Sequence, residues 1–563
     1  MRHSLRRQIV ALMAVTSLVA VSCGSPDEGT SSTSPGSVTS STSTPETTVT
    51  SVAPVTGDEP QFGGTGVIAL DGDPEHLLTA AISGTRVGMV GSKIYEGLLT
   101  YDRDYNQVPL LATEWETSED GKQVTFRLRE GVRWHDGEPF TSADVKFTYE
   151  EVVANHPSRA TAAMQEITSI DTPDDHTVVF NFDEPYGPFL LLVTNIAGIL
   201  PKHIFEGTDV LDNPAAQDTP VGTGPFMMEE WVRGQSITLV RNDDYWNAPQ
   251  PYLDRVVFSM SPDPQGRVAA FEAGEVDYLN FYFLSVAAWQ RLAEQEGVLS
   301  QREATDPYNT LLIPNHSREP LDDPIVRRAL MHAIDVDLMI EVTSGGLDNR
   351  AKSAITPALS WAYNPEVDLT ELYPYDPDKA AALLDELGYM PDANGVRFTW
   401  TLNYDAGNAV YPSYADVIIE NLRQIGIEIE AIATERAVNL EQVFGEKDFD
   451  LTLQQYSTKG DPTVGIERLY TSRYLDQGNF SNVAGWSNPE VDELFQQAGR
   501  ASDLEERAEY LYPAQEILAE ELPVLVLIDN FSGDVASAGM HGIWFEINAG
   551  DSNWAHVWRE QSG

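Results

Sequence analysis

The chain has 563 residues, of which 42% are hydrophobic and 9% aromatic, so it is long enough to build several packed domains. Its formal net charge of −52 argues against nucleic-acid binding, which needs a basic surface, and against docking on anionic lipid. Solubility or a saline habitat explains this charge, and steering of cationic ligands is a functional alternative.

The first 23 residues have the parts of a bacterial export signal. Arg2, Arg6 and Arg7 form a basic region, and the apolar run 9–21 is shorter than the roughly 20 residues that span a bilayer. The sequence Ala-Val-Ser-Cys that follows is similar to a lipobox and ends at Cys23, the one cysteine of the chain. We expect cleavage before Cys23 and lipidation of its thiol. An ordinary cleavable signal and an uncleaved anchor are the alternatives.

Residues 24–58 are rich in Ser, Thr and Pro and contain no aromatic residue, Lys or Arg. Such a segment cannot bury enough apolar surface to fold. It is predicted to be a flexible tether that holds the globular part away from the membrane.

The segment 115–144 organises the globular part. Asp120-Gly121 supplies the positive φ of a tight turn, and apolar residues alternate with polar ones over 124–128, as in a half-buried strand. Thr141 is placed to cap a helix that begins near residue 143.

This segment resembles the signature of the family 5 solute-binding proteins, the peptide and nickel receptors of bacterial ABC importers. The matching positions are Trp115, Asp120-Gly121, 126–129, Gly131-Val132, Trp134, Asp136-Gly137, Pro139-Phe140 and 143–145. Similar segments recur at 221–226, 267–277 and 326–335, so the resemblance covers about residues 63–560. An unrelated hairpin that leads into a helix is the alternative for the first segment.

The resemblance implies an α/β fold of the type II periplasmic-binding-protein kind, with two lobes and a subdomain inserted in the first. Lobe I is expected over 59–310 and 525–563, the inserted subdomain at about 100–217, and lobe II over 311–524. The alternation of helix and strand patterns between 377 and 453 agrees with an α/β lobe. A strand at 524–528 is expected to return the chain to lobe I.

The resemblance also implies positions that contact the ligand. A first strand is predicted over 66–70. Thr85 and Arg86 follow it in a loop that lines the cleft in this family, and the Arg86 guanidinium would suit a ligand carboxylate. Trp361 and Tyr363 lie in a segment similar to a family loop whose aromatic residues face the ligand. A surface arginine and ordinary aromatic packing are the respective alternatives.

The loop Gln-Tyr-Ser-Thr-Lys-Gly-Asp-Pro adds Tyr456, Thr458, Lys459 and Asp461 as expected ligand contacts. In the peptide receptors of this family, an Asp three residues before an Asp-Pro or Glu-Pro pair binds the peptide's α-ammonium. Thr458 occupies that position here, unless the alignment shifts by one residue. Because a hydroxyl is a much weaker partner for an ammonium than a carboxylate, a ligand of carboxylate, hydroxyl or sugar character fits at least as well.

The sequence contains no nucleophile elbow, His-Glu-x-x-His motif or phosphate-binding loop, and its ten histidines are dispersed. The resemblance therefore implies a receptor and not an enzyme, with no cofactor, no metal and no nucleic-acid partner. We expect a monomeric, extracytoplasmic lipoprotein at the cell surface or in the periplasm. It would capture a peptide or peptide-like solute and deliver it by hinge closure to an ABC permease and ATPase. A non-peptide solute such as an opine, oligosaccharide or nickel chelate is an alternative. A sensor without transport and a secreted hydrolase are others.

Overall fold

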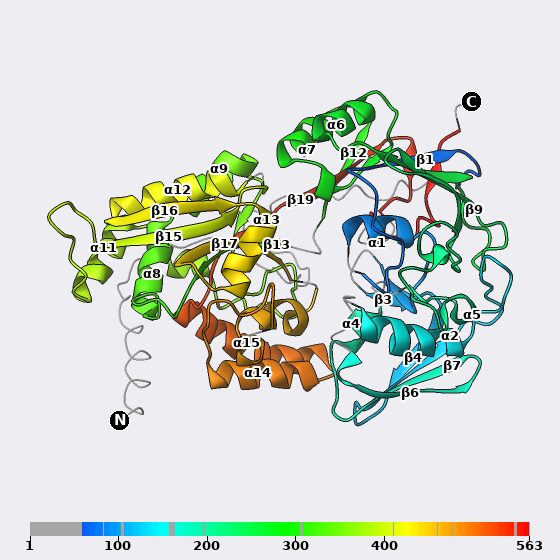
Figure 1. The fold of residues 1–563 in the computed structure, drawn as a ribbon, viewed down its shortest axis with the longest axis horizontal. Coiled ribbons are helices and arrows are strands. Elements are labelled where there is room, and N and C mark those ends of the chain that lie inside the picture. Colours follow the sequence, from blue (N-terminus) through cyan, green and yellow to red (C-terminus); the bar gives the residue numbers. More distant parts are fainter. Residues whose placement is uncertain are drawn as a thin grey trace, which may run out of the picture. The chain divides into compact units, whose positions relative to one another are not determined.

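The computed structural model describes residues 59–563 except 83, 103–105, 157–163, 195–197, 304–307, 409, 459, 476, 545–548 and 562–563 (Figure 1). The predicted signal, Cys23 and the predicted tether lie outside the described residues. Within the described ranges, no helix combines the length and the apolar character that crossing a membrane requires.

Seven strands form the first sheet, in the order β12-β19-β11-β1-β10-β9-β8. Their bounds are β1 Thr65–Leu70, β8 Phe226–Val232, β9 Ser236–Arg241, β10 Arg255–Met260, β11 Tyr278–Leu279, β12 Val298–Glu303 and β19 Ser532–Ser537. β1 lies parallel to β10 along its whole length. The helices of this part are α1 (Thr85–Gly91), α6 (Pro264–Glu272) and α7 (Val286–Ala293). α7 contributes Ala288 and Leu292 to a small apolar core that also contains Val535 of β19.

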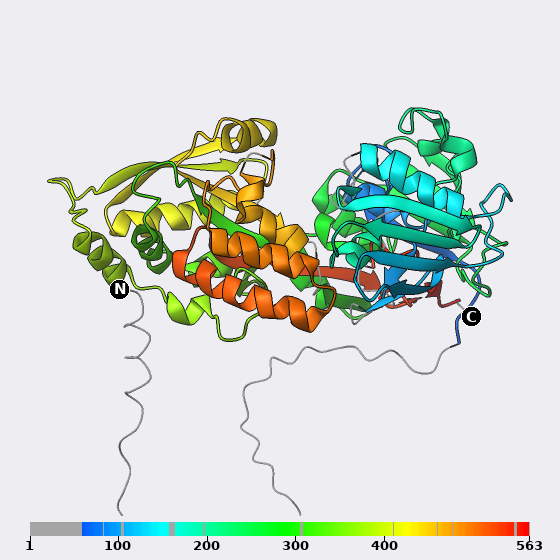
Figure 2. The ribbon, with the colours of Figure 1, turned by 90° about the horizontal axis from the view of Figure 1, so that it is seen from below.

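The inserted segment forms a separate sheet in the order β4-β5-β7-β6. Its strands are β4 Ala112–Thr117, β5 Gln123–Leu128, β6 Ile167–Asp174 and β7 Thr177–Phe182. Helix α2 (Ser142–Phe147), drawn in cyan in Figure 2, lies across one face of this sheet. As the sequence predicts, Gly121 has a positive φ of 68°, and the Thr141 amide donates to Asp144 at 2.8 Å at the start of α2. Shorter elements nearby are β2 Leu99–Tyr101, β3 Gln107–Pro109, α4 Phe189–Val193 and α5 Lys202–Phe205.

Six strands form the second large sheet, in the order β14-β18-β13-β17-β15-β16. Their bounds are β13 Tyr308–Pro314, β14 Asn349–Arg350, β15 Phe398–Asp405, β16 Ile427–Thr434, β17 Leu451–Ser457 and β18 Leu525–Asp529. β15 is parallel to both β16 and β17, whereas β13 is antiparallel to β17.

Helices cover this second sheet. They are α8 Pro324–Ala333, α9 Val336–Ser344, α10 Leu369–Leu372, α11 Pro377–Glu386, α12 Tyr411–Gln424, α13 Arg436–Leu440, α14 Pro489–Arg500 and α15 Leu504–Glu521. α12 packs along β16 (Figure 1) and buries Tyr414, Ile418 and Leu422, whose spacing places them on one helix face. Asp323 caps α8 by accepting from the Ile325 amide at 2.8 Å, and Pro324 occupies the first helical position.

The chain passes between the two large sheets twice. It leaves β12 and enters β13 through residues 304–307, and it leaves β18 and enters β19 through Asn530 and Phe531. The strand predicted at 524–528 therefore belongs to the second sheet, and the return to the first sheet follows Asp529. The sequence shows a β-branched run here but not its pairing partners, which are β14 and β13, the latter through pairs such as Leu312 with Leu525. Two further short strands, β20 (Met540–His541) and β21 (Trp558–Arg559), form an antiparallel pair after β19.

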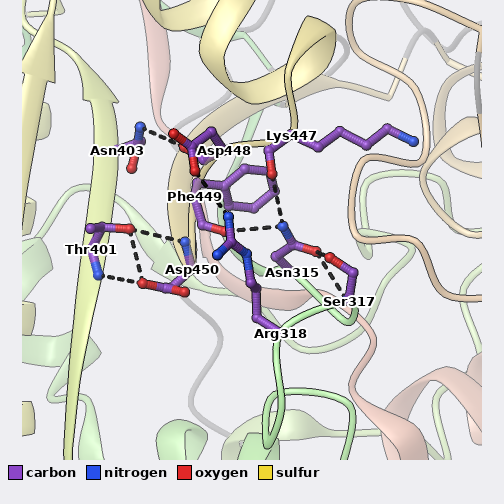
Figure 3. A network of polar contacts seen from close by, with 9 residues as sticks. All are labelled: Asn315, Ser317, Arg318, Thr401, Asn403, Lys447, Asp448, Phe449 and Asp450. Carbon is purple, nitrogen blue, oxygen red and sulfur yellow. Dashed lines mark hydrogen bonds and ion pairs between the residues drawn. The ribbon is translucent and has the colours of Figure 1, made fainter.

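A network of polar contacts fixes one end of the second sheet (Figure 3). The Asn315 side chain donates to the carbonyls of Lys447 and Phe449, and Arg318 pairs with Asp448 at 2.9 Å. Asp450 accepts from the Thr401 amide at 2.8 Å. These contacts join β13, β15 and β17 where β17 begins. The loops described next follow the opposite, carboxyl end of β17.

Candidate functional site

The carboxyl ends of three parallel strands meet at one edge of the second sheet. β15 ends at Asp405, which pairs with Thr434 at the end of β16, and β17 ends at Ser457. Tyr308, the first residue of β13, lies opposite Ser457. Because the loops after parallel strands diverge at such an edge, it is the usual place for a ligand in an open α/β sheet.

A cavity of about 280 Å³ lies at this edge. It is lined by Tyr308, Asp405, Asn408, Tyr411, Arg436, Asn439, Leu440, Gln454, Gln455, Tyr456, Ser457, Arg468 and Phe480. The volume is near the lower end of the roughly 300–1,000 Å³ that small-molecule sites enclose. The cavity therefore suits a small solute or one end of a longer one.

Two arginines and one carboxylate are the charged groups of this lining. Arg436 lies 3.6 Å from Asp405, and its side chain is 67% exposed whereas that of Asp405 is 12% exposed. Arg468 lies with its guanidinium 5.0 Å from the centre of the Tyr456 ring and donates to the Gly465 carbonyl at 2.8 Å. The described lining thus carries one more positive than negative charge.

Aromatic rings and amides make up most of the remaining lining. Phe480 meets Tyr456 edge to face, with ring centres 5.6 Å apart. Burial raises the pKa of Tyr411 and of Tyr456, so both phenols stay neutral at physiological pH. The Asn408 amide donates to the Gln455 side chain at 3.2 Å. Apolar rings with a few fixed polar groups are typical of sites for small organic ligands.

Of the residues predicted to contact a ligand, Tyr456 lines this cavity. Thr458 lies behind it, 1% exposed, and lines a second cavity of about 10 Å³ that could hold a single water. The Thr458 hydroxyl finds no hydrogen-bond partner within the described part of the chain. Lys459 lies outside the described residues.

The structure brings two other predicted residues, Asp461 and Trp361, together around Arg507. Both terminal guanidinium nitrogens of Arg507 donate to the Asp461 carboxylate, at 2.7 and 2.8 Å, and both side chains are at most 4% exposed. The Trp361 ring covers the same guanidinium at 4.8 Å. In this arrangement the Asp461 carboxylate is bound within the protein and does not face the cavity.

Thr85, Arg86 and Tyr363 lie elsewhere. Thr85 begins α1, and Arg86 forms a two-pronged ion pair with Asp71 at 2.6 and 2.9 Å, which lowers the pKa of the Asp71 carboxyl. The Tyr363 hydroxyl donates to the Val367 carbonyl at 3.4 Å. A ligand carboxylate that bound Arg86 would have to compete with Asp71.

Sequence reasoning missed the two arginines of the lining. Arg436 follows β16 and Arg468 follows the loop after β17, so the rule for carboxyl ends of parallel strands could have indicated both. That rule requires knowing that β15, β16 and β17 are parallel neighbours, which the sequence pattern alone does not state.

Burial raises the pKa of five described carboxyl groups outside the lining, namely Glu96, Asp144, Asp348, Glu467 and Asp529. The pKa rises to about 6 for Glu96 and to about 7 for Glu467 and Asp529. The Glu96 carboxylate accepts hydrogen bonds from the side chains of Thr223, Tyr245, Trp246 and Asn553. These bonds satisfy both carboxylate oxygens, which indicates a structural role for Glu96. No group of three or more His, Cys, Asp or Glu side chains within the described ranges is arranged to hold a metal ion.

Comparisons with known proteins match the fold described above. Residues 106–476 match the family described as "Bacterial extracellular solute-binding proteins, family 5 Middle". The oligopeptide-binding protein AppA of Bacillus subtilis is 28% identical over 85% of this chain and 88% of its own. Its structure in complex with a nonapeptide superposes with a TM-score of 0.74 at 25% identity, covering 89% of this chain and 100% of that one.

Two further relatives differ in their ligands. The dipeptide-binding protein of Escherichia coli is 28% identical over 82% of this chain and 88% of its own. The periplasmic binding protein AgaA of A. tumefaciens R10, in complex with agropinic acid, has a TM-score of 0.73 at 25% identity. That match covers 89% of this chain and 99% of AgaA. The two-lobed α/β fold predicted from the sequence resemblance is confirmed by these structures.

Proposed function

We propose that this chain, which belongs to the family 5 extracellular solute-binding proteins, captures a peptide or peptide-like solute for an ABC importer. The observation that carries the proposal is the cavity at the carboxyl edge of the second sheet, built from neutral aromatic rings, amides and two guanidinium groups. The role is binding and release, without a catalytic step.

Closure would use the connection through Asn530 and Phe531, between β18 and β19, as part of the hinge. Asn530, in the second connection, donates its amide to the Tyr308 carbonyl at 2.8 Å and accepts from the Gln455 side chain at 3.3 Å. Tyr308 and Gln455 both line the cavity. A ligand that contacts these residues is therefore linked by single hydrogen bonds to a hinge residue. A ligand favours the closed form only through contacts that it makes in that form alone. The hydrogen bonds to Asn530 connect such contacts to the segment that would bend on closure.

The division into lobes follows the same elements. Lobe I would comprise the first sheet and the inserted four-stranded sheet, and lobe II the second sheet. Cleavage before Cys23 would allow lipidation of its thiol, and the lipid would anchor the receptor at the outer face of the cytoplasmic membrane through the tether over 24–58. There it would act as a monomer with its permease. The lipobox-like sequence before Cys23 supports this part of the proposal.

A thermal-shift screen of the purified protein tests the proposed function. The panel holds pooled di-, tri- and longer peptides, opine-like amino-acid conjugates, oligosaccharides and nickel with histidine. A ligand at about a hundred times its dissociation constant stabilises the folded state by roughly 2.7 kcal/mol, which raises the melting temperature measurably. We expect at least one peptide pool to produce this rise. A panel in which no solute class shifts the transition would contradict the receptor function.

A non-peptide solute is the second candidate, and one observation favours it. Thr458, aligned with the Asp that binds the peptide ammonium in relatives, is a buried neutral hydroxyl. AgaA, of the same fold, is known in complex with agropinic acid. A shift with opine-like conjugates and none with peptides would establish this second candidate.

A further inference from the structure

We infer that Asn439 is a ligand-binding residue whose side-chain amide donates a hydrogen bond to a carbonyl oxygen of a peptide bond in the solute, so that the cavity selects an acceptor and not an ammonium at this position. This inference rests on the proposed function and names the group of the solute that the same site recognises. It depends on the burial of Asn439, on its hydrogen bonds and on a second amide of the lining.

The Asn439 side chain forms part of the cavity wall. Asn439 lies on α13, lines the cavity and is 1% exposed. Its oxygen Oδ1 accepts from the Gln454 side chain at 3.3 Å. Its nitrogen Nδ2 is buried and has no hydrogen-bond partner among the residues that the structure describes. Because a buried N–H group costs free energy unless an acceptor reaches it, this nitrogen favours an acceptor that enters the cavity.

Neighbouring hydrogen bonds determine which atom of the Asn439 amide is the donor. The Thr452 hydroxyl donates to the Asn403 carbonyl at 2.9 Å, and because a carbonyl only accepts, this bond uses the one hydrogen of the hydroxyl. The Gln454 atom that lies 3.0 Å from the Thr452 oxygen must therefore be its nitrogen, Nε2. The same Nε2 contacts Asn439, so the Asn439 atom that it meets is the oxygen. The nitrogen Nδ2 is then the group left for a solute.

A second amide of the lining has the same polarity. The Asn408 oxygen accepts from the backbone amides of Val410 and Tyr411, at 3.0 and 3.3 Å, where α12 begins. Since backbone N–H groups only donate, the other atom of the Asn408 amide is the nitrogen, and it donates to the Gln455 side chain at 3.2 Å. An amide nitrogen carries two hydrogens, so this bond uses one of the two. Both amides therefore have their oxygens bound within the protein.

This polarity distinguishes the groups of a solute. A carbonyl oxygen only accepts and suits the Asn439 donor, whereas an ammonium only donates and would place its hydrogens against those of the amide. A peptide bond brings such an oxygen on a neutral, planar group, which the rings of Tyr411 and Phe480 in the same lining can cover. A sugar hydroxyl also accepts, and it is the other source of an acceptor oxygen that the experiment separates.

Thioamide peptides test the hydrogen bond from the side of the solute. A thioamide keeps the plane and the N–H group of a peptide bond, but its sulfur is a weaker acceptor than oxygen. The peptide pool that binds most tightly in the thermal-shift panel is compared with pools of the same peptides that carry one thioamide, at each peptide bond in turn. We expect one thioamide position to weaken binding about 3-fold or more, measured from the concentration dependence of the melting temperature.

Variants of Asn439 test the same bond from the side of the protein. Asn439→Asp replaces the N–H group by a charged oxygen of the same shape, and we expect it to weaken binding of the peptide pool by at least about 10-fold. Asn439→Ala removes the donor without adding a charge, and should weaken binding by about 3- to 10-fold. It should also bind the oxygen and thioamide pools equally. A role of Asn439 in folding alone would not remove this preference for oxygen.

Asn421→Asp on α12 is the matched control. Asn421 is 4% exposed and also accepts through its side-chain oxygen, from the Asp335 amide at 2.9 Å, but it lies outside the lining. The same exchange of amide for carboxylate at this position should leave the affinity for the peptide pool unchanged at temperatures below the unfolding transition.

The outcomes distinguish this inference from the proposed function. Wild-type affinity for the peptide pool in Asn439→Asp and Asn439→Ala overturns the inference, because water would then satisfy the donor, and leaves the receptor function intact. So does a wild-type protein that binds every thioamide pool as tightly as the oxygen pool, or a preference for oxygen that persists in Asn439→Ala. If no peptide pool binds below about 1 mM but an oligosaccharide does, the assignment to a peptide carbonyl is overturned. The proposed function fails separately, only if every solute class fails to bind.

Discussion

Replacing Asp461 with Asn tests whether this residue stabilises the fold or contacts the ligand. The Asp461 carboxylate accepts from both terminal guanidinium nitrogens of Arg507 and from the amide and hydroxyl of Thr463, at 2.7 to 2.9 Å. Asn keeps the shape of the side chain but removes the charge and one acceptor oxygen. The change therefore leaves the Arg507 charge buried without its carboxylate.

The expected loss is large because the pair is almost fully enclosed, at 3% and 4% exposure. Breaking a buried ion pair by removing one partner typically costs about 3–5 kcal/mol. Arg507 would keep three other contacts, with the Ala498 carbonyl, the Thr463 hydroxyl and the face of Trp361. These contacts partly compensate the charge, so we expect a loss near the lower end, about 3 kcal/mol.

Denaturant unfolding followed by tryptophan fluorescence measures this loss as a lower midpoint at unchanged slope. The double variant Asp461→Asn with Arg507→Met should lose less stability than the sum of the two single variants, because it leaves no unpaired buried charge. Below its transition, Asp461→Asn should bind the solute with unchanged affinity. Normal stability combined with lost affinity would refute this reasoning and return Asp461 to the ligand site.

Three other substitutions have expected outcomes. Asp529→Asn should remove a decline in stability as pH rises from about 4 to about 7, because the folded state retains a proton that the unfolded chain releases near 3.9. Melting temperatures at pH 5 and 8 check the part of this decline between those pH values, roughly 3 kcal/mol, with the exposed Asp212→Asn as control. An unchanged or steeper decline in the variant would contradict this assignment. Thr458→Val should keep or raise the melting temperature, because the buried Thr458 hydroxyl has no hydrogen-bond partner in the described part of the chain. A loss of about 1 kcal/mol or more in the free energy of unfolding would mean that the hydroxyl has a partner outside that part. Gly465→Ala should strongly lower the yield of folded protein, because its Cβ would lie 1.8 Å from the Thr458 carbonyl oxygen; wild-type stability would disprove this close approach.

Turns, helix caps and single strands were predictable because residues a few positions apart determine each of them. The positive φ at Gly121 and the hydrogen bond between Thr141 and Asp144 are each determined by residues a few positions apart. The alternation over 124–128 likewise needs no distant partner to indicate a strand. Resemblance at fixed spacings then extended these local predictions to the confirmed family and fold.

The site was less predictable because it depends on distant neighbours. Arg436 and Arg468 become neighbours of one cavity only when β15 pairs with both β16 and β17. In the same way, the carboxylate of Asp461 is bound by Arg507, which lies 46 residues further along the chain. The sequence shows that a loop residue is charged. It does not show whether another residue of the same protein already forms an ion pair with it.

The acidity of the whole chain does not decide the sign of its solute. The formal charge of −52 is spread over 563 residues, and at physiological ionic strength charges are screened beyond about 8 Å. A solute inside the cavity is therefore governed by the groups that it touches, and the charged groups of the described lining are Arg436, Arg468 and Asp405. Long-range repulsion would slow the approach of an anion at low salt, whereas contact with the guanidinium groups would slow its departure. The net charge of the whole chain therefore does not determine which charge the cavity prefers in its solute.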